Sequence, residues 1–181
     1  MNNKNNEENI PTTFILDVDG VMTSGYFFYS ASGKIMKAFG PDDNDALSLI
    51  SKYINIRFVT GDRKGFKISK KRIVDDMGYQ LDLVSTIKRI DWIKEYFDPR
   101  KVVYMGDGIF DHYVMKEVLY SIAPSNADTN AKSFCDYVTK RNGGDRSVAE
   151  AVFHLLEKFF EPFDPLTFPK ICKKDSSEWG S

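Results

Sequence analysis

The stretch FILDVDGVMTSG, residues 14–25, places two aspartates directly after an apolar run that is typical of a buried β-strand. A carboxylate is unstable in a dry interior, so a nearby group must compensate for placing two of them there. Side chains two residues apart in an extended segment point the same way. We therefore expect Asp17 and Asp19 to serve one site at the end of the first strand.

Apolar, β-rich runs alternate with helical patterns along the whole chain. Strands are expected over residues 13–16, 54–60, 81–84, 102–105, 120–123 and 137–139, and helices over residues 45–52, 67–77, 86–97, 109–118 and 148–160. This alternation predicts an α/β fold, a parallel sheet with helices on both faces. Ligands bind at the carboxyl ends of the strands in such folds, so the strand ends are the candidate site.

Composition narrows the classes of function. The chain has 181 residues, 42% of them hydrophobic, which fits one folded domain, expected over residues 12–160 between a disordered lead-in (1–11) and an irregular tail (161–181). A net charge of −1 gives no bias toward nucleic acid or membranes. The two cysteines suggest neither a disulfide framework nor a zinc site, and the polar start is no signal peptide, so we expect a cytoplasmic protein.

Polar residues follow the other strands in the same way. Thr60 ends the second core strand, Asp107 and Asp111 follow a later one, and Lys88 stands at the start of a predicted helix. Each alone is typical of a cap or a turn. Several carboxylates at one sheet edge would repel each other without a cation, and hard carboxylate oxygens suit Mg²⁺.

These residue types fit phosphoryl transfer. One carboxylate of the first pair would attack phosphorus, and the other would donate a proton to the leaving oxygen and later take one from water. Thr60 would hydrogen-bond a phosphoryl oxygen, and Lys88 would neutralise its charge. Asp107 would hold the metal, with Asp111 orienting the metal or Lys88 from behind.

Four segments resemble the motifs of the haloacid dehalogenase (HAD) superfamily of phosphatases: DVDGVMTSG, VTGDR, the lysine of STIKRI, and YMGDGIFD. The hairpin followed by KAF, and YVTKRNGGDRSVAEAV, resemble its small capless branch, which contains 3-deoxy-D-manno-octulosonate 8-phosphate phosphatase. The likeness covers roughly residues 14–156. It implies a Rossmann-like sheet with a small β-hairpin instead of a cap domain.

The resemblance also implies roles. Asp17 would be the nucleophile and Asp19 the acid/base. Mg²⁺ would be bound by the side chains of Asp17 and Asp107 and the backbone carbonyl of Asp19, while Thr60 and Lys88 would hold the phosphate.

Three further residues, Gly61, Arg63 and Arg141, are predicted to contact the phosphate or the rest of the substrate. The chain also departs from the family pattern in three places: Asp62 stands before Arg63, Gly108 replaces a second aspartate, and residues 42–44 read Asp-Asp-Asn rather than Arg-Asp-Gly. An acidic cluster at 42–44 would repel a substrate carboxylate unless a cation intervened.

The predicted hairpin, residues 26–39, carries aromatic and aliphatic side chains on both faces. A two-stranded hairpin cannot bury both faces by itself, and exposed apolar area of this kind marks an interface. We therefore expect a homo-oligomer, and the resemblance implies a tetramer in which the hairpins pack together and a neighbour helps to close the site. The alternative is that the hairpin folds back over its own domain.

The leading hypothesis is a Mg²⁺-dependent phosphomonoesterase for a small phosphorylated sugar acid similar to 3-deoxy-D-manno-octulosonate 8-phosphate. A nonulosonate 9-phosphate or another sugar phosphate is the alternative substrate. Two rivals from other classes are a receiver-like signalling domain and an inactive oligomerisation module. A receiver accepts its phosphate at the end of the third strand, where LDLV ends without an aspartate.

Overall fold

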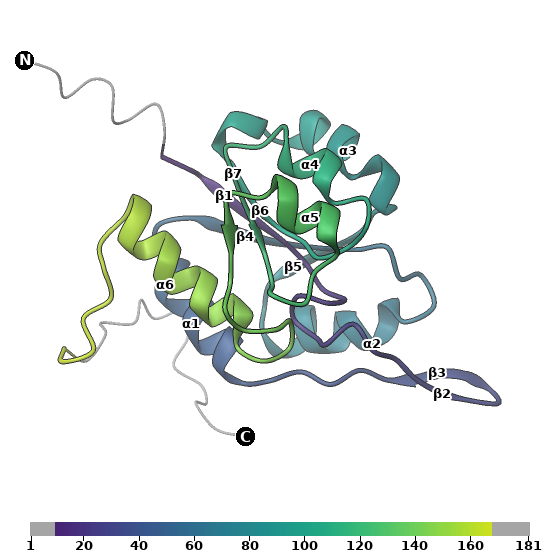
Figure 1. The fold of residues 1–181 in the computed structure, drawn as a ribbon. Helices are drawn as coiled ribbons and strands as arrows, with labels where there is room; N and C mark the ends of the chain where they lie inside the picture. Colours follow the sequence, from purple (N-terminus) through teal and green to yellow (C-terminus); the bar gives the residue numbers. More distant parts are fainter. Residues whose placement is uncertain (1–9, 168–181) are drawn as a thin grey trace, which may run out of the picture.

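The computed structural model describes residues 10–167, which form a six-stranded parallel sheet between two layers of helices (Figure 1). The strand order is β5-β4-β1-β6-β7-β8, and all neighbours are parallel. Their bounds are β1 Thr13–Asp17, β4 Asn55–Thr60, β5 Gln80–Leu83, β6 Val102–Met105, β7 Tyr120–Ala123 and β8 Tyr137–Val138. The predicted α/β sheet is confirmed, and β1, which carries the first aspartate, lies at its centre.

Side chains of β1 alternate between two hydrophobic clusters, one on each face of the sheet. Phe14 and Leu16 pack with α1 (Asp42–Ile50) and α6 (Ser147–Phe159), whereas Ile15 packs on the other side. That second face is covered by α3 (Arg89–Tyr96), α4 (His112–Met115) and α5 (Thr129–Phe134). The predicted helices on both faces are thus confirmed (Figure 1).

Some elements differ from the predicted bounds. The helix expected over 67–77 is α2 (Phe66–Lys70) continued by a π-helical segment (Lys71–Asp76), and the one expected over 86–97 begins as a 3-10 turn (Thr86–Lys88) before α3. The sequence missed α5 because Ala131 is its one buried residue, which leaves no apolar period to read. The helix expected over 109–118 is shorter because Asp111 first closes a turn with the Gly108 N–H.

The predicted lead-in (1–11) and tail (161–181) fall mostly on residues 1–9 and 168–181, which lie outside the described part. Within residues 10–167, no helix combines the length and the apolar character needed to cross a bilayer.

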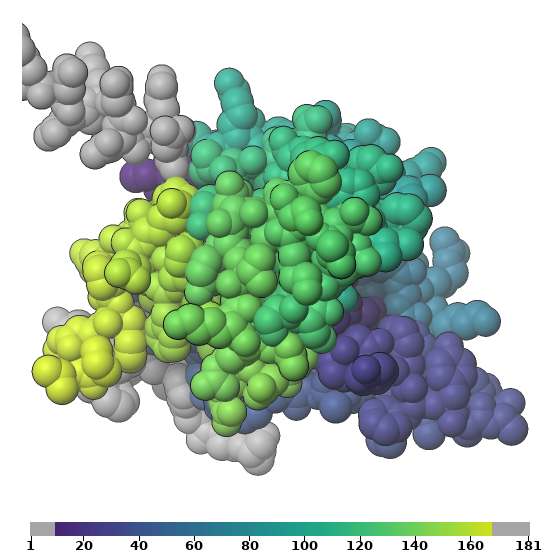
Figure 2. Space-filling view, viewed as in Figure 1, coloured from purple at the N-terminus to yellow at the C-terminus, as the bar shows by residue number. Residues whose placement is uncertain are grey.

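The hairpin, β2 (Phe28–Ser30) and β3 (Gly33–Met36), projects from the body of the molecule (Figures 1 and 2). Its apolar side chains are exposed, among them Tyr26, Phe28, Tyr29, Ile35 and Met36. The hairpin therefore does not bury its faces against its own domain, contrary to the alternative interpretation of the sequence.

A late loop, residues 141–146, packs against the loop that follows β1. The Gly144 N–H donates to the Val21 carbonyl at 3.0 Å, and a Cβ at Gly143 would lie 1.7 Å from the Gly20 carbonyl oxygen. The glycine pair is there because two backbones approach too closely for a side chain.

We predict that Gly143→Ala lowers the free energy of unfolding by about 1–3 kcal/mol, because backbone must move to admit the methyl group. Gly40→Ala is the matched control, since a methyl group there would have no atom within 4 Å beyond the adjoining residues, and its change should stay within about 0.5 kcal/mol. Denaturant unfolding of both variants tests this. Equal stability of the two would show that the close approach is not a constraint.

Candidate active site

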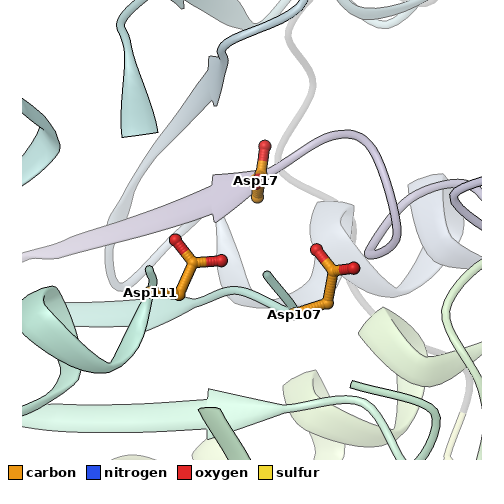
Figure 3. Close-up of side chains that lie close together, drawn as sticks. All are labelled: Asp17, Asp107 and Asp111. Atoms are coloured by element: carbon orange, nitrogen blue, oxygen red, sulfur yellow. The ribbon is translucent and has the colours of Figure 1, made fainter. Parts of the chain in front are cut away.

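Three carboxylates gather where β1 and β6 end (Figure 3). Asp17 is the last residue of β1, Asp107 follows β6, and Asp111 directly precedes α4. One oxygen from each lies within 4.8 Å of the others, so these groups are close enough to surround one cation. The structure therefore meets the geometric condition for Asp17 and Asp107 to share a metal ion.

The guanidinium of Arg89, the first residue of α3, is inserted into this group. Its Nη1 donates to Asp17 Oδ2 at 2.8 Å, to Asp111 Oδ1 at 3.0 Å and to the Tyr104 hydroxyl at 2.6 Å. The side chain is completely buried, and its Nε and Nη2 have no hydrogen-bond partner among the described residues. Two buried donors thus remain for an anion beside Asp17.

Lys88, predicted to neutralise the phosphate, is exposed at the end of the 3-10 turn and does not line the pocket. Arg89 occupies the position expected for it. The adjacent basic residues Lys88 and Arg89 in STIKRI indicate that a cation lies near the phosphate. The sequence does not show which of the two side chains the 3-10 turn directs into the site.

Burial and neighbouring carboxylates raise the pKa values of two carboxyl groups at the site. Burial, with Asp111 and Asp19 nearby, raises the pKa of Asp17 to about 6 against the opposing effect of Arg89. Burial and the charges of Asp17 and Asp111 raise the pKa of Asp107 to about 8. Two carboxyls that resist ionisation without additional positive charge fit a site for a divalent cation with oxygen ligands.

Asp111 is already occupied by protein partners. Its Oδ1 accepts from the Tyr104 hydroxyl at 2.6 Å as well as from Arg89, and its Oδ2 accepts from the Gly108 N–H at 2.8 Å. Asp111 therefore orients Arg89 and the loop after β6. Asp17 also accepts hydrogen bonds, from Arg89 and from the Val18 N–H at 2.7 Å, so all three carboxylates remain candidate side-chain ligands.

Gly20 makes room for Asp107. Its φ is +95°, and a Cβ there would lie 1.9 Å from Asp107 Oδ2. Gly20 of the DxDG motif is thus required both by the turn and by the nearby carboxylate of Asp107.

Asp19 is held by two groups. Its Oδ2 accepts from Thr60 Oγ1 at 2.9 Å, and its Oδ1 lies 2.6 Å from Lys37 Nζ, an ion pair without the direction of a good hydrogen bond. Thr60, fully buried, also accepts from the Asp62 N–H at 3.0 Å. Thr60 ends β4 beside Asp19, and its hydroxyl is hydrogen-bonded to that carboxylate. Sequence reasoning did not assign Lys37 to the site.

A pocket of about 490 Å³ opens over these groups. Gly61 and Arg63, two of the predicted substrate contacts, line it, whereas Arg141 is exposed on the late loop and is not among its lining residues. The other lining residues are Asp17, Asp19, Phe27, Asp62, Leu83, Ser85, Thr86, Arg89, Asp107 and Gly108.

Asp42, Asp43 and Asn44 do not line this pocket. Asp42 pairs with Arg146, and buried Asp43 accepts from the Ala149 N–H at 2.9 Å. They join α1 to α6, so the expected repulsion of a substrate carboxylate does not follow from their placement.

Comparisons with known proteins agree with this geometry. A family profile described as haloacid dehalogenase-like hydrolase matches residues 92–152. The 3-deoxy-D-manno-octulosonate 8-phosphate phosphatase of Escherichia coli K12 is 31% identical over 152 residues, which cover 78% of this chain and 77% of that protein. The enzyme of the same name from Yersinia pestis is 29% identical over 146 residues, covering 75% of this chain and 74% of that protein.

Solved structures show the same fold. The cobalt-bound deoxy-D-mannose-octulosonate 8-phosphate phosphatase of Haemophilus influenzae superposes with a TM-score of 0.72 at 27% identity, covering 83% of this chain and 89% of that one. The Yersinia pestis phosphatase gives a TM-score of 0.68 at 26% identity and covers 83% of each chain. The chain therefore belongs to the haloacid dehalogenase-like hydrolases and is a phosphatase that resembles the 3-deoxy-D-manno-octulosonate 8-phosphate phosphatases.

Proposed function

We propose that the chain is a cytoplasmic, Mg²⁺-dependent phosphomonoesterase that hydrolyses a small phosphorylated sugar acid through an aspartyl-phosphate on Asp17. The observation that carries the proposal is the position of Asp17. Its carboxylate stands at the end of the central strand, beside Asp107 and against a buried guanidinium that still has free donors.

The residues divide the reaction into two steps. In the first, a carboxylate oxygen of Asp17 attacks phosphorus, the bond to the leaving oxygen breaks, and Asp19 gives that oxygen a proton. In the second, water attacks phosphorus, Asp19 takes a proton from the water, and the bond between Asp17 and phosphorus breaks to release phosphate. The free nitrogens of Arg89 would bind phosphoryl oxygens in both steps, which makes Arg89 the group that neutralises their charge.

The side chains of Asp17 and Asp107, with the backbone carbonyl of Asp19, would hold the Mg²⁺. When bound, the ion supplies positive charge to the carboxylates and the phosphoryl group. The cobalt-bound relative from Haemophilus influenzae supports a divalent ion in this fold.

The substrate class rests on the relatives, whose names give 3-deoxy-D-manno-octulosonate 8-phosphate as their substrate. The exposed guanidinium of Arg63 at the pocket is suited to a second anionic group, such as a sugar-acid carboxylate. A nonulosonate 9-phosphate or another sugar phosphate is the alternative. Family membership argues against a receiver domain, and β5 ends at Leu83 rather than at an aspartate.

We predict that Asp17→Asn lowers kcat for 4-nitrophenyl phosphate at least about 1,000-fold, because the amide cannot accept the phosphoryl group. Chelation of divalent ions should abolish wild-type turnover, and Mg²⁺ should restore it. A colorimetric assay measures both. Equal rates for wild type and Asp17→Asn would remove the nucleophile assignment.

A separate screen of the wild type against sugar-acid and neutral sugar phosphates tests the substrate class, because it ranks the substrates by kcat/KM.

Arg89 and Lys88 provide a matched pair. We predict that Arg89→Met lowers kcat/KM about 100-fold or more, while Lys88→Met changes it by less than about threefold, because only Arg89 faces the pocket. Arg89→Lys keeps the charge and should retain more activity than Arg89→Met, which covers the case in which the methionine variant does not fold. A larger effect at Lys88 would reverse the assignment.

We also propose that the chain is a homo-oligomer, a tetramer, assembled through residues 26–39. Tyr29 and Ile35 are 61% and 49% exposed on the hairpin. The double variant Tyr29→Ser/Ile35→Ser should therefore lower the mass measured by light scattering after size-exclusion chromatography. Tyr96→Ser, at a tyrosine 62% exposed on α3, is the control and should leave the mass unchanged. An unchanged mass for the hairpin variant contradicts the proposed interface.

A further inference from the structure

Lys37 joins the hairpin to the acid/base residue. It directly follows β3, and its side chain is completely buried. Its Nζ lies 2.6 Å from Asp19 Oδ1 and 2.9 Å from Asp62 Oδ2, and it donates to Ser69 Oγ at 2.8 Å. Because a buried charge is costly unless it is paired, these two carboxylates and the hydroxyl hold the Lys37 ammonium in one position.

Asp62 holds that ammonium in place. It also pairs with Lys34, whose Nζ lies 3.2 Å from the centre of the Phe27 ring. Burial would raise the pKa of Asp62, but hydrogen bonds from Lys34, Lys37 and the Gly65 N–H outweigh it and lower the pKa to about 2. The residue that interrupts the family's second motif is thus a charged anchor for the base of the hairpin.

Asp19 is consequently oriented from both sides. Thr60 donates to one of its oxygens and Lys37 stands against the other. We infer that Lys37 is a positioning residue that holds Asp19 in the orientation in which it accepts a proton from the attacking water. This inference rests on the proposed function.

When the leaving group is good, hydrolysis of the aspartyl-phosphate depends more on the orientation of Asp19 than transfer of the phosphoryl group to Asp17 does. 4-Nitrophenolate departs from phosphorus without help from an acid, so transfer to Asp17 tolerates a misplaced Asp19. Hydrolysis of the aspartyl-phosphate still needs Asp19 in place, because a base must take a proton from the water as it attacks phosphorus. Loss of Lys37 should therefore slow release of phosphate from Asp17 and let the phosphorylated protein accumulate.

The test is rapid mixing of Lys37→Met with 4-nitrophenyl phosphate and Mg²⁺. We expect kcat to fall about 10- to 100-fold while kcat/KM stays within about threefold of wild type. We also expect a burst of 4-nitrophenolate that is larger than that of wild type and approaches one per chain. General damage to the site would instead lower kcat and kcat/KM by the same factor with no burst, and that result overturns the inference.

Three further variants make the test decisive. Lys37→Gln is one atom shorter and uncharged but keeps a polar end group, so a second protein can show the burst if the methionine variant does not fold. Lys34→Met breaks an ion pair with the same Asp62 but leaves Lys37 beside Asp19, so a burst of equal size in Lys34→Met overturns the specific role of Lys37. Asp17→Asn separates the two hypotheses. If Asp17→Asn turns over 4-nitrophenyl phosphate as fast as wild type, the proposed function fails. If Asp17→Asn is inactive and wild type is active, but Lys37→Met gives no enlarged burst, only this inference is overturned.

Discussion

The ion pair between the Arg89 guanidinium and the carboxylates of Asp17 and Asp111 determines how the rest of the site is arranged. Three different elements supply these groups: the end of β1, the start of α3 and the residue before α4. Buried charges are costly unless each is paired, so these elements must meet in one register. The same contact turns Asp17 toward the space that Asp107 borders and leaves two donors of Arg89 for an anion.

Much of this arrangement can be predicted from the sequence. The apolar runs and the polar residues that end them place Asp17, Thr60 and Asp107 at one edge of a parallel sheet, and the structure agrees. These predictions succeed because apolar runs mark buried strands, and the alternation of strands with helices along the chain indicates a parallel sheet whose carboxyl ends meet at one edge. The hairpin and its exposed faces follow from the same reasoning.

Other parts could not be predicted because they depend on a single turn or on contacts between distant segments. The choice of Arg89 over Lys88 is set by how a 3-10 turn of three residues passes into α3. The pair between Lys37 and Asp62 joins a hairpin to a loop after β4, and no periodicity records it. Asp42 and Asp43 looked like part of a substrate site, yet they bind Arg146 and the start of α6.

The departures from the family pattern thus have different meanings. Asp62 anchors two lysines, so it belongs to the organisation of the site. Gly108 donates its N–H to Asp111 and lines the pocket, so the loop after β6 retains an ordered shape without a second aspartate there. The Asp-Asp-Asn segment at 42–44, in contrast, lies outside the pocket lining, where Asp42 pairs with Arg146 and Asp43 accepts from the Ala149 N–H.

The contact between Gly20 and Asp107 has an evolutionary consequence. Because any side chain at position 20 would occupy the place of the Asp107 carboxylate, a single codon change there displaces that carboxylate without touching either hydrophobic layer. Descendants of this chain can therefore lose chemistry while they keep their architecture, and the residue at position 20 is the first place to look when a silent paralogue must be told from an active one.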